Sequence, residues 1–173
     1  MGFDFRVDFL MTKRVLFVCL GNICRSPAAE AVAAHLVAAR NLAIEVDSAG
    51  TIDAHAGRPP DRRMKAAGES RGYQFVTRAR QVTGDDLLPG RFDLIIAMDR
   101  ENLRDIRRLS NHSTEHVKLF GDFLQQSPAP DVPDPYYGGP AGFETVLDML
   151  EAGCPHILTA LTAKTTDNSD CSD

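Results

Sequence analysis

The segment Val18-Cys-Leu-Gly-Asn-Ile-Cys-Arg-Ser-Pro27 joins the end of a predicted strand to the start of a predicted helix. The run before it, residues 14–19, is β-branched and aromatic, which is typical of a buried strand. Residues 27–40 after it are rich in alanine with apolar side chains at helical spacing, and we expect Asn41 to end this helix. Pro27 would occupy the first helical position, directly after Ser26. The segment therefore predicts a strand-to-helix turn of an α/β fold.

The same alternation of strands and helices continues along the chain. Further strands are predicted for residues 43–48, 91–98 and 117–120, and further helices for residues 61–67, 100–109 and 143–161. We expect Gly68 to stop the second helix, Asp99 to cap the third and Pro155 to kink or split the last. Strands separated by helices predict one α/β domain, a three-layer sandwich with helices on both faces of a parallel sheet. In such sheets the ligand site lies at the carboxyl ends of the strands.

Composition and charge exclude several classes of protein. The chain has 173 residues, of which 43% are hydrophobic and 25% charged, the balance of one globular domain. A net charge of −5 without any block of Lys or Arg argues against a nucleic-acid partner. No apolar run approaches the ~18–20 residues that span a bilayer, so no membrane partner is expected.

Both ends of the chain are expected to lie outside the folded domain. Residues 1–12 are predicted to be a poorly ordered N-terminal extension, with Met11 as the original start. The folded domain then covers residues 13–163, and residues 164–173 form a loose polar tail. The first residues mix Asp and Arg with Phe, which is not the pattern of a secretory signal. We therefore expect a cytoplasmic protein.

The loop from Cys19 to Arg25 has the residues of an anion-binding site. Gly21 and Asn22 tolerate left-handed backbone angles, so several N–H groups can point at one anion. The helix N-terminus adds a favourable dipole, and the Arg25 guanidinium matches two phosphate oxygens. These groups favour the thiolate of Cys19, whose pKa we expect well below ~8.5. Because a thiolate can attack phosphorus in line with a leaving oxygen, the loop predicts a cysteine-dependent reaction on phosphate esters.

The four cysteines give no sign of a metal site or a disulfide framework. Cys19, Cys24, Cys154 and Cys171 show no C-x-x-C spacing, and no His lies at zinc-site spacing from them. No metal and no cofactor are therefore expected. Cys154 falls on an apolar helical stripe and is predicted to be a core residue, whereas Cys171 lies in the polar tail.

Four separated motifs in one order resemble a known family. They are Cys-Leu-Gly-Asn-Ile-Cys-Arg-Ser-Pro at 19–27, Asp-Ser-Ala-Gly-Thr at 47–51 with Arg-Ala-Arg-Gln at 78–81, Phe-Asp-Leu-Ile-Ile-Ala-Met-Asp at 92–99 with Asn102, and Asp-Val-Pro-Asp-Pro-Tyr-Tyr-Gly at 131–138. Together they resemble the low-molecular-weight protein tyrosine phosphatases over residues 13–161. The resemblance implies a four-stranded sheet of order 2-1-3-4 and a metal-independent hydrolase. The expected partners are a phosphotyrosine-bearing protein or a small aryl phosphate, with inorganic phosphate or other oxyanions in the loop. We expect a monomer or a weak dimer.

The resemblance also implies a role for each matching residue. Cys19 would form a phosphocysteine, Arg25 would bind the phosphoryl group, and Asp134 would act as general acid and then as base. Ser48 and Asp99 would support the loop from behind. The remaining phosphate-binding residues are Leu20, Gly21, Asn22, Ile23, Cys24 and Ser26, and the substrate slot is formed by Leu20, Ile23, His55, Tyr136 and Tyr137. The sequence around Asp134 supports this role independently of the resemblance, because Pro133 and Pro135 stiffen the loop that must place its carboxyl group.

Cys24 admits two interpretations. The family resemblance implies a reversible disulfide with Cys19 that would protect the nucleophile from over-oxidation. A packed thiol without a redox role explains the residue equally well.

Two positions depart from the family pattern. Ala54 stands where an aromatic residue often forms one wall of the slot, so the substrate preference is expected to differ. Thr77 stands where a His often precedes the Ala-Arg-Gln stretch, so the polar network behind the loop is expected to differ as well.

Three alternative functions stay open on the same fold. An arsenate reductase would need further cysteines near the middle of the chain, and none lies between Cys24 and Cys154. A protein arginine phosphatase typically carries Thr at the position of Ile23. A catalytically idle phosphate-binding module would be expected to have lost Cys19, Arg25 or Asp134, and all three are present.

Overall fold

The fold is built on one parallel sheet. The computed structural model describes residues 11–163, so residues 1–10 of the predicted extension and the predicted tail, 164–173, lie outside the described residues. Four parallel strands pair in the order β2-β1-β3-β4. Their bounds are Lys13–Cys19 (β1), Ile44–Gly50 (β2), Leu94–Ala97 (β3) and Val117–Leu119 (β4). The predicted sheet order is confirmed.

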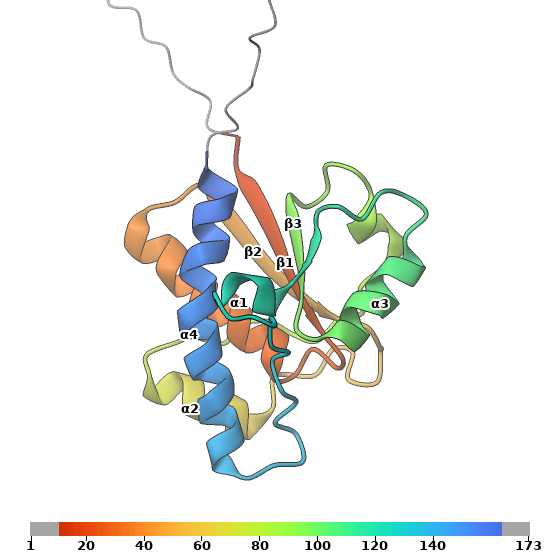
Figure 1. Cartoon of the computed structure of the whole chain (residues 1–173). Helices are drawn as coiled ribbons and strands as arrows, with labels where there is room; N and C mark the ends of the chain where they lie inside the picture. Colours follow the sequence, from red (N-terminus) through yellow and green to blue (C-terminus); the bar gives the residue numbers. More distant parts are fainter. Residues whose placement is uncertain (1–10, 164–173) are drawn as a thin grey trace, which may run out of the picture.

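Helices cover both faces of this sheet. Four α-helices and two short 3₁₀ helices are present: Arg25–Arg40 (α1), Arg62–Ser70 (α2), Gly84–Leu87 (η1), Arg100–Leu109 (α3), Phe120–Phe123 (η2) and Pro140–Thr162 (α4). In Figure 1, α1, α2 and α4 lie on one side of the sheet and α3 lies on the other. The expected three-layer sandwich is therefore confirmed.

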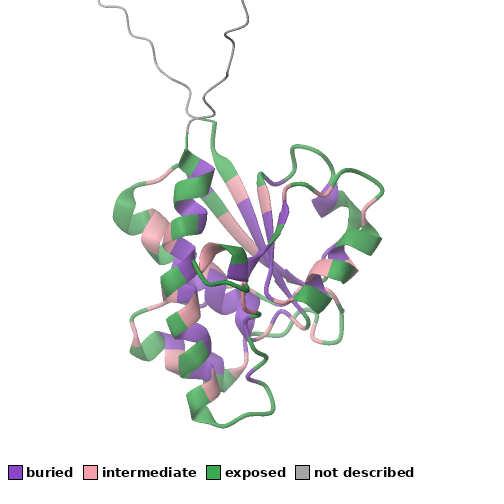
Figure 2. Ribbon diagram, viewed as in Figure 1, coloured by how far each residue is buried: buried purple, intermediate pink, exposed green. Residues whose placement is uncertain are grey.

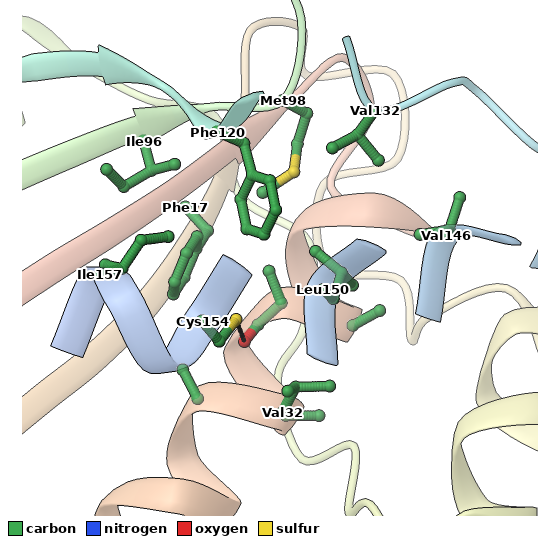
Figure 3. Close-up of a cluster of buried hydrophobic side chains, with 14 of the residues drawn as sticks. Phe17, Val32, Ile96, Met98, Phe120, Val132, Val146, Leu150, Cys154 and Ile157 are labelled. Carbon is green, nitrogen blue, oxygen red and sulfur yellow. Dashed lines mark hydrogen bonds between the residues drawn. The ribbon is translucent and has the colours of Figure 1, made fainter. Parts of the chain in front are cut away.

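Alternation along the central strand β1 divides the core in two. Val15 and Phe17 point to the face covered by α1 and α4, whereas Leu16 and Val18 point to the face covered by α3, and all four are fully buried. Figure 2 shows the resulting buried band along the middle of the sheet. Figure 3 shows Phe17 packed among side chains of α4 and the neighbouring η2, including Phe120. Each such side chain contributes roughly 1.5–3 kcal/mol relative to exposure, so burial on two faces holds β1 firmly.

The carboxyl end of β1 is held against the end of β2. The N–H of Thr51 donates to the Cys19 carbonyl at 2.9 Å, and the N–H of Ile52 donates to the Leu20 carbonyl at 3.1 Å. Gly50 makes this approach possible, because a Cβ atom there would lie 2.7 Å from the Leu20 carbonyl oxygen. The loop after β1 therefore starts from a fixed position.

Two predictions about helix limits are wrong. The first hydrogen bond of α1 runs from the N–H of Ala28 to the Cys24 carbonyl, so the helix begins at Arg25 and Pro27 is its third residue. At that position a missing N–H still costs nothing. Gly68 does not stop α2; it lies inside the helix, where a Cβ atom would come within 2.4 Å of the Phe75 ring.

Pro155 does not split the last helix. The helix α4 continues through it to Thr162. Cys154, Ile157 and Leu158 on either side are fully buried. Burial of this stripe holds both halves against the same sheet face, which offsets the hydrogen bond that proline lacks.

Two other local predictions agree with the structure. Asn41 ends α1 in the left-handed conformation, with φ of 51°. Asp99 caps α3, because its carboxylate accepts the N–H of Asn102 at 2.7 Å.

Candidate active site

The loop between β1 and α1 folds back on a left-handed residue. Asn22 has φ of 54° and is fully buried, although it is polar. Asparagine adopts this backbone region more easily than most residues, which explains its place in the loop. Its side-chain carbonyl accepts the N–H of Arg80 at 2.9 Å, so a distant segment fixes the amide.

The sulfur of Cys19 lies at the base of the loop. The residue is 3% exposed, and its Sγ atom is 3.1 Å from the Ser26 hydroxyl. The same hydroxyl lies 3.1 Å from the Ala49 carbonyl and accepts the Asn22 amide N–H at 2.9 Å. Ser26 can therefore donate its single proton either to the sulfur or to the Ala49 carbonyl.

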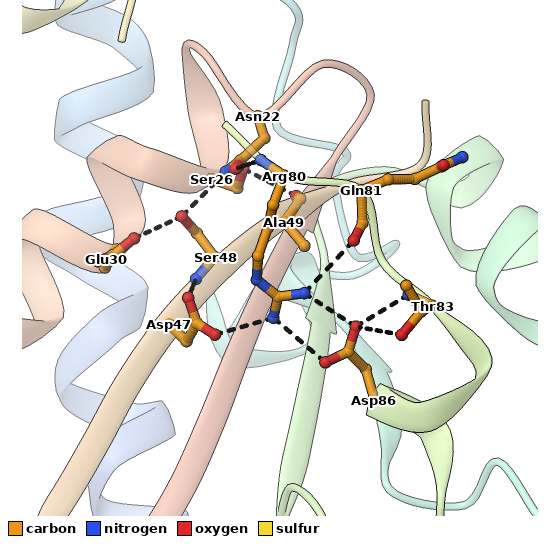
Figure 4. A network of polar contacts seen from close by, with 10 residues as sticks. All are labelled: Asn22, Ser26, Glu30, Asp47, Ser48, Ala49, Arg80, Gln81, Thr83 and Asp86. Carbon is orange, nitrogen blue, oxygen red and sulfur yellow. Dashed lines mark hydrogen bonds and ion pairs between the residues drawn. The ribbon is translucent and has the colours of Figure 1, made fainter. Parts of the chain in front are cut away.

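A polar network supports the loop from behind (Figure 4). The Asn22 amide also donates to the Ser48 hydroxyl at 2.9 Å, and Ser48 donates to Glu30 at 2.5 Å. Next to it, Arg80 pairs with Asp47 at 2.8 Å and with Asp86 at 2.9 Å. The predicted position of Ser48 behind the loop agrees with these contacts.

The guanidinium of Arg25 is oriented by one of its two terminal nitrogens. Nη1 lies 2.5 Å from an Asp99 carboxylate oxygen and 3.1 Å from the Val132 carbonyl. Nη2 lies 3.4 Å from an Asp134 oxygen. Burial by itself would lower the pKa of Arg25, but Cys19, Asp99 and Asp134 together raise it. Arg25 is thus a fixed, permanently charged group beside the sulfur.

Asp134 reaches this centre from the loop before α4. One carboxylate oxygen faces Arg25, and the other accepts the N–H of Tyr136 at 3.1 Å. Its side chain is 41% exposed, so the carboxyl group can contact both the loop and an entering ligand. Nearby, the rings of Tyr136 and Tyr137 meet edge to face with centroids 4.9 Å apart.

These groups line one cavity of about 290 Å³. Its walls include every residue predicted for the substrate slot, together with the three predicted catalytic residues. His55 lies directly over the loop, because a Cβ atom on Gly21 would come within 2.9 Å of its ring. Ile52 also lines the cavity and was not predicted, whereas Ala54 does not line it. Ile52 follows the Ser-Ala-Gly-Thr stretch directly, but only the pairing of its N–H with Leu20 brings it to the rim.

Two further residues near the centre were missed by the sequence analysis. Glu30 lies in the middle of α1, where a carboxylate is ordinarily an exposed residue. Arg80 belongs to the Ala-Arg-Gln stretch, whose partners could not be inferred from its position in the chain. Thr77 lies near Glu30, and its hydroxyl offsets part of the rise in the pKa of that carboxyl group; that it changes the network relative to the family stays a prediction.

Cys24 is a buried thiol at the edge of the cavity. Burial first, and then Asp61 and Cys19, raise its pKa to about 12, so it stays protonated at neutral pH. A protonated thiol attacks sulfur slowly, which favours the packed-thiol interpretation, and the disulfide with Cys19 stays a prediction. Burial also raises the pKa of Cys154, which lies in the core as predicted.

The described residues show neither a metal cluster nor a membrane helix. Within 11–163, no three His, Cys, Asp or Glu side chains gather as metal ligands would. No helix in this part of the chain has the length and hydrophobicity needed to cross a bilayer.

Comparison with known proteins places the chain in a family. The family model for low molecular weight phosphotyrosine protein phosphatase matches residues 14–167. The low molecular weight protein-tyrosine-phosphatase YfkJ of Bacillus subtilis is 43% identical over 151 residues, which are 85% of this chain and 94% of YfkJ.

Solved structures agree with this match. A protein tyrosine phosphatase from Entamoeba histolytica, with Hepes in its active site, superposes with a TM-score of 0.81 at 41% identity, covering 86% of this chain and 96% of that one. DARP, a Drosophila arginine phosphatase, superposes with a TM-score of 0.79 at 31% identity, covering 87% and 98%. Sequence and fold match over nearly the whole described domain, and the chain belongs to the low molecular weight phosphotyrosine protein phosphatase family.

Proposed function

We propose that this chain hydrolyses phosphotyrosine in proteins, and small aryl phosphates, through a phosphocysteine intermediate on Cys19. The observation that carries the proposal is the meeting of a sulfur, a fixed guanidinium and a carboxyl group in one cavity with an aromatic rim. Each of the three groups can perform one part of a phosphoryl transfer.

In the first half-reaction the Cys19 thiolate attacks phosphorus. An S–P bond forms while the bond from phosphorus to the phenolic oxygen breaks, and the electron pair stays on that oxygen. Asp134 in its acid form donates a proton to the leaving oxygen. Arg25 balances the negative charge on the other phosphoryl oxygens, which it can do from a position that Asp99 and Val132 hold.

In the second half-reaction water replaces the sulfur. Asp134, now ionised, takes a proton from water as the oxygen attacks phosphorus. The S–P bond breaks and its electron pair returns to Cys19 as thiolate, while inorganic phosphate leaves. The Ser26 hydroxyl, 3.1 Å from the sulfur, can donate to that thiolate and stabilise it.

The size and surface of the cavity support an aryl ester. A cavity of about 150 Å³ holds benzene, so about 290 Å³ provides room for an aromatic ring and a phosphoryl group. Eight large hydrophobic side chains are exposed within residues 11–163, and four of them line this cavity: Leu20, Ile52, Tyr136 and Tyr137. Such a concentration of apolar surface is typical of a binding site for a protein segment.

Ile23 supports phosphotyrosine over phosphoarginine. Its side chain lines the cavity and has no hydrogen-bond acceptor, whereas a guanidinium group retains several N–H donors that need partners. The similarity to the Drosophila arginine phosphatase keeps phosphoarginine as the second candidate.

The experiment compares p-nitrophenyl phosphate, a phosphotyrosine peptide and a phosphoarginine peptide on the wild type and on Cys19→Ser. We expect the wild type to prefer the two aryl esters, with and without chelator, and Cys19→Ser to lose turnover while it still binds phosphate. Substantial turnover by Cys19→Ser would contradict the phosphocysteine mechanism. A higher kcat/KM for phosphoarginine would reverse the assignment of the substrate.

A further inference from the structure

Four hydrogen bonds connect Glu30 in α1 to the sulfur of Cys19. They run from Glu30 to the Ser48 hydroxyl at 2.5 Å, to the Asn22 amide at 2.9 Å, to the Ser26 hydroxyl at 2.9 Å, and to the sulfur at 3.1 Å. The three residues between the two ends are fully buried, so water does not interrupt the series. Figure 4 shows Glu30, Ser48, Asn22 and Ser26 in this order.

The number of protons in the series fixes the direction of the bonds between Asn22, the two serines and Glu30. The Asn22 amide has two N–H groups, and it donates one to Ser48 and one to Ser26. Its oxygen accepts the N–H of Arg80, so the amide cannot turn over without losing that bond. Each serine oxygen therefore accepts from Asn22 and has one proton of its own to donate. For Ser48 the acceptor is the Glu30 carboxylate, and for Ser26 it is the sulfur or the Ala49 carbonyl, each at 3.1 Å.

The charge around Glu30 is unbalanced. Arg80 shares its guanidinium between Asp47 and Asp86. With Glu30, three carboxylates therefore lie near a single cation. Within residues 11–163, Glu30 forms no ion pair, and the Ser48 hydroxyl donates a hydrogen bond to it, with the Thr77 hydroxyl nearby. Burial raises the pKa of Glu30 above its ordinary 4.5, and Asp47 adds to this. The two hydroxyls and Arg80 offset part of the shift.

We propose that Glu30 is a positioning residue whose ionised carboxylate holds the Ser48 proton and, through the Asn22 amide, holds the Ser26 hydroxyl within reach of Cys19. If Glu30 is protonated, its own O–H competes for the Ser48 oxygen, and the Ser48 proton loses its acceptor. An unsatisfied buried hydroxyl is costly, so the amide and Ser26 are expected to shift. Activity should therefore fall as the pH falls through the titration of Glu30. The activity readout rests on the proposed function.

The test compares Glu30→Gln and Glu30→Ala with Glu45→Gln, an exposed carboxylate of β2 that serves as the matched control. The pH profile of kcat/KM for p-nitrophenyl phosphate is measured for each protein. Glu30→Gln keeps an oxygen for the Ser48 proton but cannot titrate. We expect it to retain most of the wild-type kcat and to lose one step on the acidic side of the profile. Glu30→Ala should lose about 2- to 10-fold in kcat, as expected for one hydrogen bond.

A second readout does not depend on hydrolysis. The rate at which iodoacetamide alkylates Cys19, followed on the Cys19 peptide by mass spectrometry, should change with pH differently in Glu30→Gln and in the wild type. If both readouts of Glu30→Gln superimpose on those of the wild type, as those of Glu45→Gln should, the proposal is wrong. An inactive wild type with the expected alkylation difference would overturn the proposed function and leave the role of Glu30 supported. If Glu30→Ala does not fold, the comparison of Glu30→Gln with the wild type still tests the proposed role of Glu30.

Discussion

The Asp99 carboxylate makes two contacts, and two substitutions of this residue can separate their contributions. One oxygen accepts the N–H of Asn102 at 2.7 Å and caps α3, and the other lies 2.5 Å from Nη1 of Arg25. Asp99→Ala removes both contacts, whereas Asp99→Asn keeps an oxygen for the cap and loses the charge. An N-cap contributes about 1 kcal/mol, and a hydrogen bond to a charged group about 1.5–3 kcal/mol.

These values predict the stabilities of the two variants. The free energy of unfolding should fall by about 1.5–3 kcal/mol in Asp99→Asn and by about 2.5–4 kcal/mol in Asp99→Ala. The loss is not larger because Arg25, although 3% exposed, keeps its contacts with Val132 and Asp134. Urea unfolding measures both values, with Asp105→Asn on the same helix as the control.

Activity should respond differently from stability. Both variants free the Arg25 guanidinium to turn, and misplacement of a binding group by about 1 Å can cost up to about 100-fold. We therefore expect kcat/KM for p-nitrophenyl phosphate to fall by about 10- to 100-fold in both, with weaker inhibition by inorganic phosphate. Wild-type kcat/KM in Asp99→Asn would refute the orienting role. Equal free energies of unfolding for the two variants would refute the predicted contribution of the Asp99 cap to stability.

Two further substitutions test the acid and the loop. Asp134→Ala should lower kcat by about 10²–10⁴-fold, most strongly for aryl phosphates with poor leaving groups, because only those depend on proton donation. An equal loss across a series of substituted phenols would remove Asp134 from this role. Gly50→Ala should displace the phosphate loop, because the added Cβ would lie 2.7 Å from the Leu20 carbonyl oxygen, and it should cost about 1–3 kcal/mol of stability as well as activity. Gly84→Ala, where no neighbouring atom lies within 4 Å, is the control, and equal effects of the two substitutions would contradict this explanation.

The pattern of strands and helices was predictable because it depends on local periodicity. The β1 strand, the Asn41 end of α1 and the Asp99 cap each follow from a residue and its near neighbours. Gly68 and Pro155 misled the prediction, because their local preference to end a helix is outweighed by packing against Phe75 and against the sheet. Such packing involves residues far away in the sequence.

The candidate active site also has a part that follows from local sequence and a part that depends on distant residues. The sequence by itself determined which groups are available, since a loop of Cys19, Gly21, Asn22 and Arg25 at a strand-to-helix turn already specifies an anion site with a nucleophile. Only the tertiary structure decided what surrounds it. Asp134, 109 residues beyond Arg25, reaches the same cavity, and Glu30 connects to the sulfur through a residue of β2. These contacts depend on which strands are neighbours and where their carboxyl ends meet, and the burial of two apolar faces around β1 determines that arrangement.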